Sequence, residues 1–333
     1  MSSVEQALPT VSVVILAYNR RDTVAFNLDK VFGALDYPND RLEVVVADNA
    51  STDGTAEMVR ERFPQARVLR LEENVGFEAV NRAFAATSGE WALVLDDDCY
   101  MEGDSLRRAL LTAAREDADL VSFSVDSSEP GQSFTEDYRT GLMMFWACSV
   151  LISRRAIDRT GGFDDRLFIW GNEVELTMRL LDAGFKHLHL PDVRSVHMKP
   201  LRGITEDFNT RNLRHLAYVA GKLLQPVDAA VAAWNLTMQA ALTALRYRGG
   251  YARGIPAVWQ GFRDGLAVRE PVRPAVSRLF RRHFIEFASN VQLWPRIRHL
   301  LVHRGRPGTD FRQAFWAARP KLYPRASASL QLR

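Results

Sequence analysis

The chain has 333 residues, of which 47% are hydrophobic and 25% are charged, so it can bury a large core and is not a disordered segment. It has no apolar run of the roughly 18 to 20 residues that a membrane-spanning helix needs, and its first residues lack the pattern of a secretory signal. We therefore expect a cytoplasmic protein. Its two cysteines, Cys99 and Cys148, lack the spacing of a zinc site, and we expect them to be packing residues.

The small net charge of +3 hides an asymmetry between the two parts of the chain. Residues 1–210 carry 22 Lys and Arg against 35 Asp and Glu (net −13), whereas residues 211–333 carry 21 against 5 (net +16). An acidic part that handles an anionic ligand needs a cation as mediator. A basic part can rest against anionic lipid or phosphate.

Apolar strand-like runs alternate with helical patterns in the first part of the chain. We expect strands in VSVVILA, LEVVVAD, ARVLRLE and EWALVLDDD, with helices in DTVAFNLDKVFGAL, TAEMVRERF and EAVNRAFAATSG between them. This alternation predicts an α/β fold with a mostly parallel central sheet and helices on both faces. Ligands bind at the carboxyl ends of such strands, where Tyr18, Asn19, Asp48 and the run Asp96–Asp98 are expected.

Further along, the segment ADLVSFSVD predicts another strand and EVELTMRLLDAGF an amphipathic helix that stops near Gly184. The segment KHLHLPDVRSVH is expected to be extended and to end at His197. After about residue 205 the pattern becomes helical, and the final segment RASASLQLR is expected to fray. The sequence thus predicts a catalytic domain over 1–205 and a basic, mainly helical region over 206–333.

The acidic run after the fourth expected strand is the first candidate for chemistry. In an extended strand, Asp96 and Asp98 project to the same side, while Asp97 points elsewhere. Crowded carboxylates repel one another, and a divalent cation relieves that repulsion. Oxygen ligands of this kind suit Mg²⁺ or Mn²⁺. The alternative is a solvated acidic turn at the start of the next helix.

Five segments, AYNRRDTV, VVADNASTDGT, ENVGFEAVNRAFAATSGEWALVLDDD, TGGFDDRLF and GNEVELTMRLLDAG, occur in the order and spacing typical of family 2 glycosyltransferases. The chain resembles this family, and its bacterial rhamnosyltransferase-like members in particular, over about residues 10 to 200. The resemblance implies the GT-A fold, a Rossmann-like α/β architecture. It also implies an inverting transfer of a hexosyl or deoxyhexosyl group to an acceptor hydroxyl.

The resemblance further implies where the nucleotide-sugar donor binds. The first strand end lies against the base, Asp48 accepts a hydrogen bond from a pyrimidine ring nitrogen, and Asp98 binds a metal that bridges the diphosphate. Asp96 is shared between ribose and metal, and His197 completes the metal site or touches the diphosphate, although an isolated histidine is more often structural. The expected nucleotide-sugar contacts are Ala17, Tyr18, Asn19, Arg20, Asp48, Asn49, Asp96 and Asp97.

By the same resemblance, Glu173 is the general base that takes the proton of the acceptor hydroxyl, an effect typically worth about 10²- to 10⁴-fold in rate. The Glu-Asp pair of the family is replaced here by Asn172-Glu173, which lengthens the base by one methylene. Glu175 is the fallback, and a purely structural carboxylate at a helix N-terminus is the alternative. The residues expected at the acceptor are Trp146, Asp164, Asp165, Trp170 and Asn172.

Several readings remain open. The donor is a UDP- or dTDP-sugar, and the acceptor is a glycan or lipid-linked glycan of the cell envelope, or a small natural product. A catalytically silent nucleotide-sugar-binding protein is a rival, whereas a nucleotidyltransferase would be expected to have a glycine-rich loop that AYNRRDTV lacks. The basic region either contacts the inner face of the membrane as a peripheral protein or packs on the catalytic domain or a second copy. No nucleic-acid partner is expected.

Overall fold

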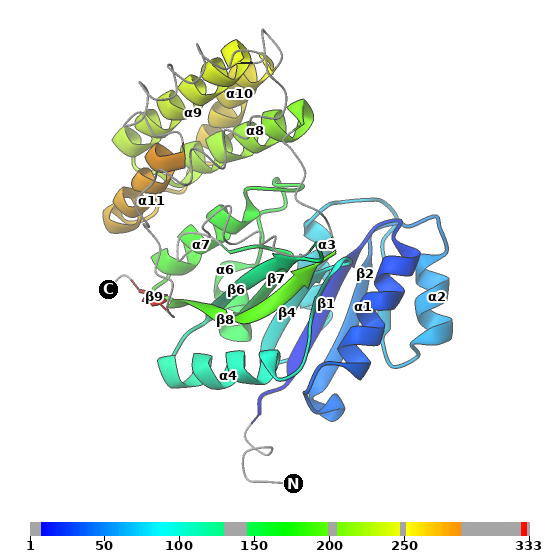
Figure 1. Ribbon diagram of the computed structural model, residues 1–333. Helices are drawn as coiled ribbons and strands as arrows, with labels where there is room; N and C mark the ends of the chain where they lie inside the picture. Colours follow the sequence, from blue (N-terminus) through cyan, green and yellow to red (C-terminus); the bar gives the residue numbers. More distant parts are fainter. Residues whose placement is uncertain (1–7, 130–144, 199–204, 247–250, 288–327, 332–333) are drawn as a thin grey trace. The chain divides into compact units, whose positions relative to one another are not determined.

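The computed structural model describes residues 8–129, 145–198, 205–246, 251–287 and 328–331 (Figure 1). The chain divides into two compact units, one formed by Met1–Leu201 together with Lys321–Arg333 and the other by Arg202–Pro320. The division after Leu201 lies close to the boundary expected from the sequence. The return of the last residues to the first unit was not expected.

Within the described residues, the first unit contains a nine-stranded sheet with the order β3-β2-β1-β4-β7-β6-β8-β5, and β9 pairs with β8 beside this path. The strands are β1 Val11–Ala17, β2 Leu42–Asp48, β3 Arg67–Arg70, β4 Trp91–Asp96, β5 Cys99–Met101, β6 Leu120–Ser127, β7 Ser149–Ser153, β8 His187–His197 and β9 Ala328–Leu330. The helices are α1 Arg21–Gly33, α2 Thr55–Arg62, α3 Glu78–Ala85, α4 Ser105–Glu116, α6 Arg154–Thr160 and α7 Asn172–Asp182, with a short 3₁₀ turn, η2, at Asn39–Arg41.

The sheet is parallel in one part and mixed in the other. β1 lies parallel to both β2 and β4, and β2 lies parallel to β3, as the alternation of strands and helices predicted. β7, which the sequence analysis did not identify, runs antiparallel between β4 and β6, and β8 is parallel to β6 but antiparallel to β5 and β9. The expectation that RASASLQLR frays was wrong for Ala328–Leu330, which pair with β8, while residues 325–327 and 332–333 of this segment lie outside the described residues.

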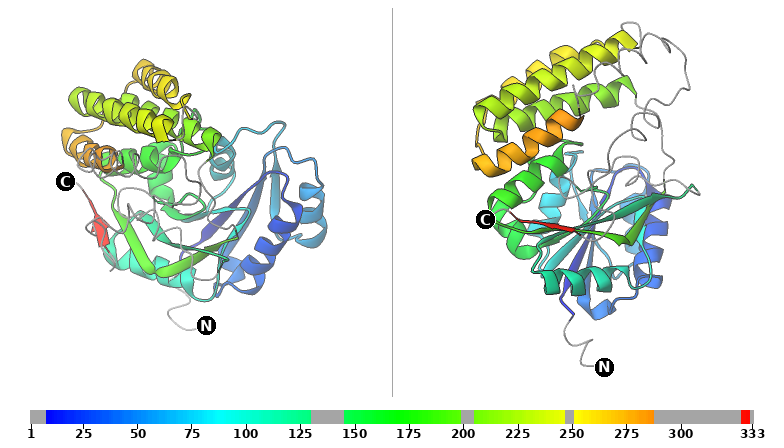
Figure 2. Two further views of the ribbon diagram at one scale, coloured as in Figure 1. Left: turned by 45° about the horizontal axis from the view of Figure 1, so that its top comes forward. Right: turned by 60° about the vertical axis from the view of Figure 1, so that its left-hand side comes forward.

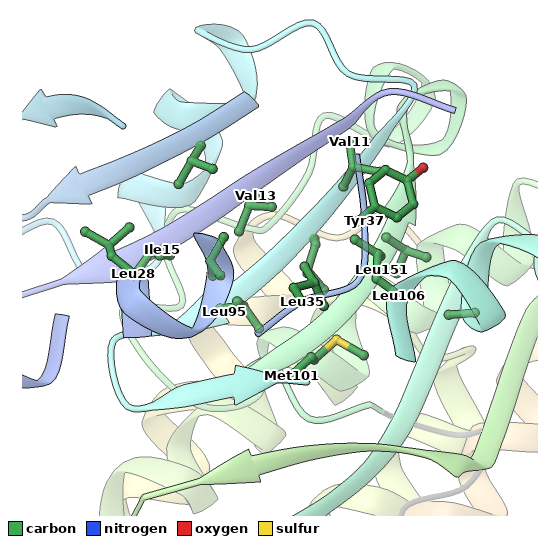
Figure 3. Packing of buried hydrophobic residues seen from close by; sticks show 14 of the residues in the cluster. Val11, Val13, Ile15, Leu28, Leu35, Tyr37, Leu95, Met101, Leu106 and Leu151 are labelled. Carbon is green, nitrogen blue, oxygen red and sulfur yellow. The ribbon is translucent and has the colours of Figure 1, made fainter. Parts of the chain in front are cut away.

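Both faces of the sheet are covered by helices, and β1 shows why its sequence is apolar throughout. Val11, Val13 and Ile15 belong to the core on the side of α1, α2 and α4, where they pack around side chains such as Leu28 and Leu95 (Figure 3). Val14, which points the other way, packs in the core on the side of α3, α6 and α7. A strand buried on both faces needs no polar alternation.

The second unit consists, in its described part, of α8 Glu206–Leu223, α9 Pro226–Arg246, α10 Gly254–Ala267 and α11 Pro274–Phe287, which pack on one another (Figure 2). Gly261 and Gly265 of α10 lie directly against the backbone carbonyls of Arg214 and Tyr218 in α8, so that a Cβ at either glycine would overlap α8. The two helices therefore approach more closely than larger residues would permit. Among the described helices, none combines the length and the apolar character needed to cross a bilayer.

Candidate active site

The carboxyl ends of β1 and β2 form one wall of the candidate donor site. Asp48, the last residue of β2, is fully buried, and its Oδ1 accepts a hydrogen bond of 3.0 Å from the Ser51 N–H. No described residue donates a hydrogen bond to Oδ2, whose nearest cation is Nε of Arg70 at 3.8 Å. Asp48 therefore keeps one buried carboxylate oxygen that can accept a hydrogen bond from a ligand.

Two asparagines shape the loops beside Asp48. Asn19 adopts the left-handed conformation (φ 52°), its N–H donates to Ser51 Oγ at 2.9 Å, and its Oδ1 accepts from the Thr52 N–H at 2.8 Å. Asn49 donates its N–H to the Ala17 carbonyl at 2.8 Å, and its side chain bonds the backbone at Val75 and Gly76. The hydrogen bonds of both asparagines therefore hold the loops beside Asp48 together. The side chains of Tyr18 and Arg20 are exposed at the same strand end.

The acidic run forms a cluster with a histidine from a distant part of the chain. One ligand atom from each of Asp96, Asp98 and His197 lies within 4.8 Å of the others, and Nε2 of His197 is 2.9 Å from Oδ1 of Asp98. β5 creates this proximity, because Cys99 pairs with His197 across the β5–β8 ladder. Asp97 lies in the turn between β4 and β5. Two carboxylates and one imidazole are a donor set that fits a divalent cation such as Mn²⁺ or Mg²⁺.

Asn27 of α1 holds the backbone of this acidic turn. The side chain is fully buried, and its Nδ2 donates hydrogen bonds of 2.9 Å to the carbonyls of Asp96 and Cys99. These two carbonyls lie on either side of Asp97 and Asp98, so one amide group fixes both ends of the turn. The sequence analysis missed Asn27. The only signal was a polar residue among the apolar positions of an amphipathic helix.

Glu173 lies in the first turn of α7, after Gly171 in the left-handed conformation (φ 85°). Burial, together with repulsion from the nearby Asp96 carboxylate, raises the pKa of Glu173 to about 7, although hydrogen bonds from backbone N–H groups, including that of Ala147, oppose the rise. Glu173 is therefore near enough to Asp96 of the acidic cluster for the two carboxylates to repel each other. A carboxylate with a pKa near 7 is well matched to proton transfer at neutral pH.

Glu175, the fallback base, is used differently. Its carboxylate is fully buried and forms a two-bond ion pair with Arg179, at 2.8 Å and 2.7 Å. Arg179 also donates to the carbonyls of Thr160 and Gly162, so the pair ties α7 to the glycine turn after α6. Glu175 is thereby committed to the fold of this region, and the structure leaves Glu173 as the base candidate.

The loop before α7 carries most of the predicted acceptor residues. Asn172 is buried, and neither of its amide atoms forms a hydrogen bond within the described part of the chain. Trp170 has a left-handed backbone (φ 65°), and Asp165 is exposed. Asp164 is buried, and its Oδ1 accepts a hydrogen bond of 3.0 Å from the Arg166 N–H. Asn172, the first residue of α7, therefore has buried amide atoms that can bond a ligand.

This loop is fixed to the segment before α3, which belongs to a different motif of the sequence. Gly76 (φ 64°) lies directly under the Phe168 backbone, and the Phe77 N–H donates to the Phe168 carbonyl at 3.0 Å. Asn81 forms two hydrogen bonds with the backbone of Phe163, at 2.7 Å and 2.9 Å. Contacts between motifs more than 80 residues apart thus hold the loop before α7 against the segment at the start of α3.

Trp146 and the two cysteines form a separate small cluster. Trp146 packs against Cys99, Val125 and Cys148, which are buried, and both cysteines are free thiols. A hydrogen bond with Cys99 and burial raise the pKa of the Cys148 thiol. The expectation that the cysteines are packing residues agrees with this burial.

Comparisons with known proteins agree with the geometry. A family model described as "Glycosyl transferase family 2" matches residues 12–165. Glycosyltransferase AglE of Haloferax volcanii is 30% identical over 206 residues, which cover 57% of this chain and 67% of AglE. The chain belongs to glycosyl transferase family 2. It is therefore a glycosyltransferase. A second relative of this family 2 enzyme, N-acetylglucosaminyl-diphospho-decaprenol L-rhamnosyltransferase of Mycobacterium tuberculosis, is 26% identical over 221 residues, covering 52% of this chain and 72% of the relative.

Solved structures support the fold assignment of this family 2 member. The mannosyltransferase PcManGT of Pyrobaculum calidifontis, solved with GDP-Man and Mn²⁺, superposes with a TM-score of 0.55 at 22% identity and covers 90% of this chain and 88% of that protein. Residues 1–349 of S. aureus TarS, solved with UDP-GlcNAc, give a TM-score of 0.55 at 16% identity, with 82% of this chain and 92% of that protein covered. At such identities the likeness shows the GT-A fold alone.

Proposed function

We propose that this glycosyltransferase moves a hexosyl or deoxyhexosyl group from a UDP- or dTDP-linked donor to an acceptor hydroxyl, with inversion at the anomeric carbon and with the help of Mg²⁺ or Mn²⁺. The observation that carries the proposal is the meeting of the cluster Asp96, Asp98 and His197 with a glutamate of raised pKa, Glu173. Transfer from a diphosphate to a hydroxyl needs a cation site and a base within reach of the same substrates.

In the proposed step, the Glu173 carboxylate takes the proton of the acceptor hydroxyl. The hydroxyl oxygen forms a bond to the anomeric carbon, and the bond from this carbon to the diphosphate oxygen breaks with its electron pair remaining on the diphosphate. A divalent cation held by Asp96, Asp98 and His197 would offset the negative charge that develops there. Burial and Asp96 raise the pKa of Glu173 to about 7. A carboxylate with this pKa is a stronger base than an exposed glutamate and is still partly deprotonated near pH 7, so it can accept the proton.

The assignment of a pyrimidine donor rests on Asp48. Its Oδ2 is buried and receives no hydrogen bond from a described residue, so a ring N–H would satisfy it. Tyr18, exposed at the neighbouring strand end, offers a ring to pack against the base. The titles of the solved structures name GDP-Man for one neighbour and UDP-GlcNAc for another, so a donor panel has to include guanosine as well as uridine and thymidine compounds.

The acceptor is proposed to be a glycan or a lipid-linked glycan in cell-envelope polysaccharide or glycoconjugate synthesis. The relative from M. tuberculosis is named for action on a decaprenol-linked sugar, and other relatives are named for succinoglycan and teichuronic acid biosynthesis. Asn172 has buried amide atoms that can bond acceptor hydroxyls. A cytoplasmic protein lying on the inner face of the membrane through its basic C-terminal region would meet such an acceptor.

The test is donor binding followed by transfer. Thermal stabilisation by UDP-, dTDP- and GDP-sugars, each with Mn²⁺, Mg²⁺ or EDTA, identifies the nucleotide and the need for metal. Glu173→Gln is expected to abolish transfer while donor stabilisation remains. Glu116→Gln, an exposed glutamate on α4, is the matched control and is expected to keep wild-type transfer. Stabilisation by no nucleotide sugar refutes the proposal, and full transfer by Glu173→Gln refutes the role of the base.

A further inference from the structure

α9 of the helical unit carries a continuous apolar stripe on its exposed side. Its members are three or four residues apart and therefore lie along one side of the helix. They are Val227, Val231, Trp234, Met238, Ala241 and Leu245, named here the α9 stripe. Val227, Trp234 and Leu245 are 70%, 59% and 61% exposed. The stripe extends over about 27 Å of helix.

The opposite side of α9 is apolar too. It packs inside the unit with Ala229, Ala232, Ala233, Leu236 and Ala240. Residues 229–245 carry no charged side chain, and the hydroxyls of Thr237 and Thr243 donate back to carbonyls of the same helix at 2.8 Å. A helix that is apolar on two opposite sides is normally covered on both, so the α9 stripe is expected to have an apolar partner.

The charge of the surrounding region decides which partner fits. Residues 211–333 carry 21 Lys and Arg against 5 Asp and Glu, and Arg253, Arg263, Arg273 and Arg278 of the neighbouring helical segments are exposed. Two copies that meet through this region would bring like charges together. An anionic lipid surface offers both an apolar interior for the stripe and negative charge for the arginines.

Aromatic residues add a second argument for lipid. Trp234 lies in the middle of the α9 stripe, and Trp259 of α10 is 51% exposed with its ring 6.2 Å from that of Phe262. Tryptophan concentrates at the boundary between headgroups and acyl chains, where one part of the ring is dry and the N–H remains hydrated. α9 falls short of the character needed to span a bilayer, which fits a helix that lies in the plane of the interface.

We infer that the α9 stripe is the surface by which this protein lies on an anionic lipid bilayer, with Trp234 at its centre. The inference rests on the membrane placement proposed above for the basic region and assigns a defined surface to it. An amphipathic contact of this kind binds through buried apolar area plus attraction to anionic lipid, and one charged residue within the stripe disturbs both.

The test is sedimentation of the full chain with vesicles of phosphatidylcholine, with and without about a third of phosphatidylglycerol. The wild type is expected to bind the anionic vesicles, and Trp234→Glu to bind at least about tenfold more weakly. Val227→Glu, at the most exposed stripe position, is the second variant in case Trp234→Glu unfolds. Leu111→Glu, on an exposed apolar residue of α4 outside the stripe, is the matched control and is expected to bind as the wild type does.

Thermal unfolding and light scattering complete the design. No binding by the wild type, or wild-type binding by folded Trp234→Glu and Val227→Glu, overturns the inference. A dimer of the wild type that Trp234→Glu dissociates, without any vesicle binding, also overturns it in favour of a second copy. Stabilisation by nucleotide sugars is measured in the same samples. If no nucleotide sugar stabilises the protein, the proposed function is refuted. If a stripe variant keeps this stabilisation but loses vesicle binding, the α9 stripe acts in membrane binding and not in donor binding.

Discussion

Replacing Asn27 by alanine should weaken cation binding at the proposed site of Asp96, Asp98 and His197, although Asn27 is not one of the proposed ligands. The variant removes both 2.9 Å hydrogen bonds to the carbonyls of Asp96 and Cys99 and leaves those carbonyls buried without this donor. Each unsatisfied buried group costs about 1–3 kcal/mol, so the loss of two hydrogen bonds should lower the free energy of unfolding by about 2–6 kcal/mol. Groups that orient metal ligands typically contribute about 10- to 100-fold to metal affinity. We therefore expect Mn²⁺ to bind Asn27→Ala about 10- to 100-fold more weakly.

The assay is a calorimetric titration with Mn²⁺ in the absence of donor, together with urea denaturation of each variant. Asn81→Ala is the matched control, because Asn81 also makes two side-chain hydrogen bonds to backbone groups, those of Phe163, but at the glycine turn. It should lose stability and keep its Mn²⁺ affinity. Equal Mn²⁺ affinity in Asn27→Ala and the wild type would refute the reasoning, as would an equal loss of affinity in both variants.

Three further predictions follow from the charges in the first unit. The proposed role of Glu173 as base requires its deprotonated form, and its pKa is raised to about 7. We therefore expect kcat/KM to increase with pH to a midpoint at about 7, or below it if a cation bound nearby lowers that pKa, and a profile flat from about pH 5 to 8 contradicts this. Arg179→Ala leaves the buried Glu175 carboxylate uncompensated and should cost about 3–5 kcal/mol in urea denaturation, against less than about 1 kcal/mol if the pair is incidental. Burial lowers the pKa of His189 to about 4, below the value of about 6.5 for an exposed histidine, so this side chain binds a proton more tightly in the unfolded chain. The free energy of unfolding should therefore fall as the pH is lowered from about 6.5 to 4, and His189→Gln should reduce that decrease in urea denaturation.

The sequence was most informative about the carboxyl ends of the parallel strands. Asp48 and the run Asp96–Asp98 could be placed at one edge of the sheet because apolar runs alternate with helices and parallel strands end together. The partner of Asp98 could not be placed in this way. His197 reaches it through β5, a strand of three residues that is too short to leave a periodic signal.

Strand direction was the other limit. The segment Ser149–Ser153 is an apolar run like those of the first strands, and nothing in its composition says that it runs antiparallel between β4 and β6. Choosing between Glu173 and Glu175 needed coordinates as well. Two residues on the same helix turn face different ways, and only the ion pair with Arg179 shows which carboxylate is already used.

Because β9 pairs with β8, the chain returns to the sheet of the first unit after the helical unit. The helical unit is therefore an insertion in the sequence of the first unit. A chain shortened before Lys321 therefore loses a piece of the catalytic unit along with the helices. The backbone groups at His187 and His189 of β8 would then face solvent as an open edge, ready to pair with another chain. A variant designed to remove the helical unit should therefore keep residues 321–333 and connect them to Leu201 through a flexible linker.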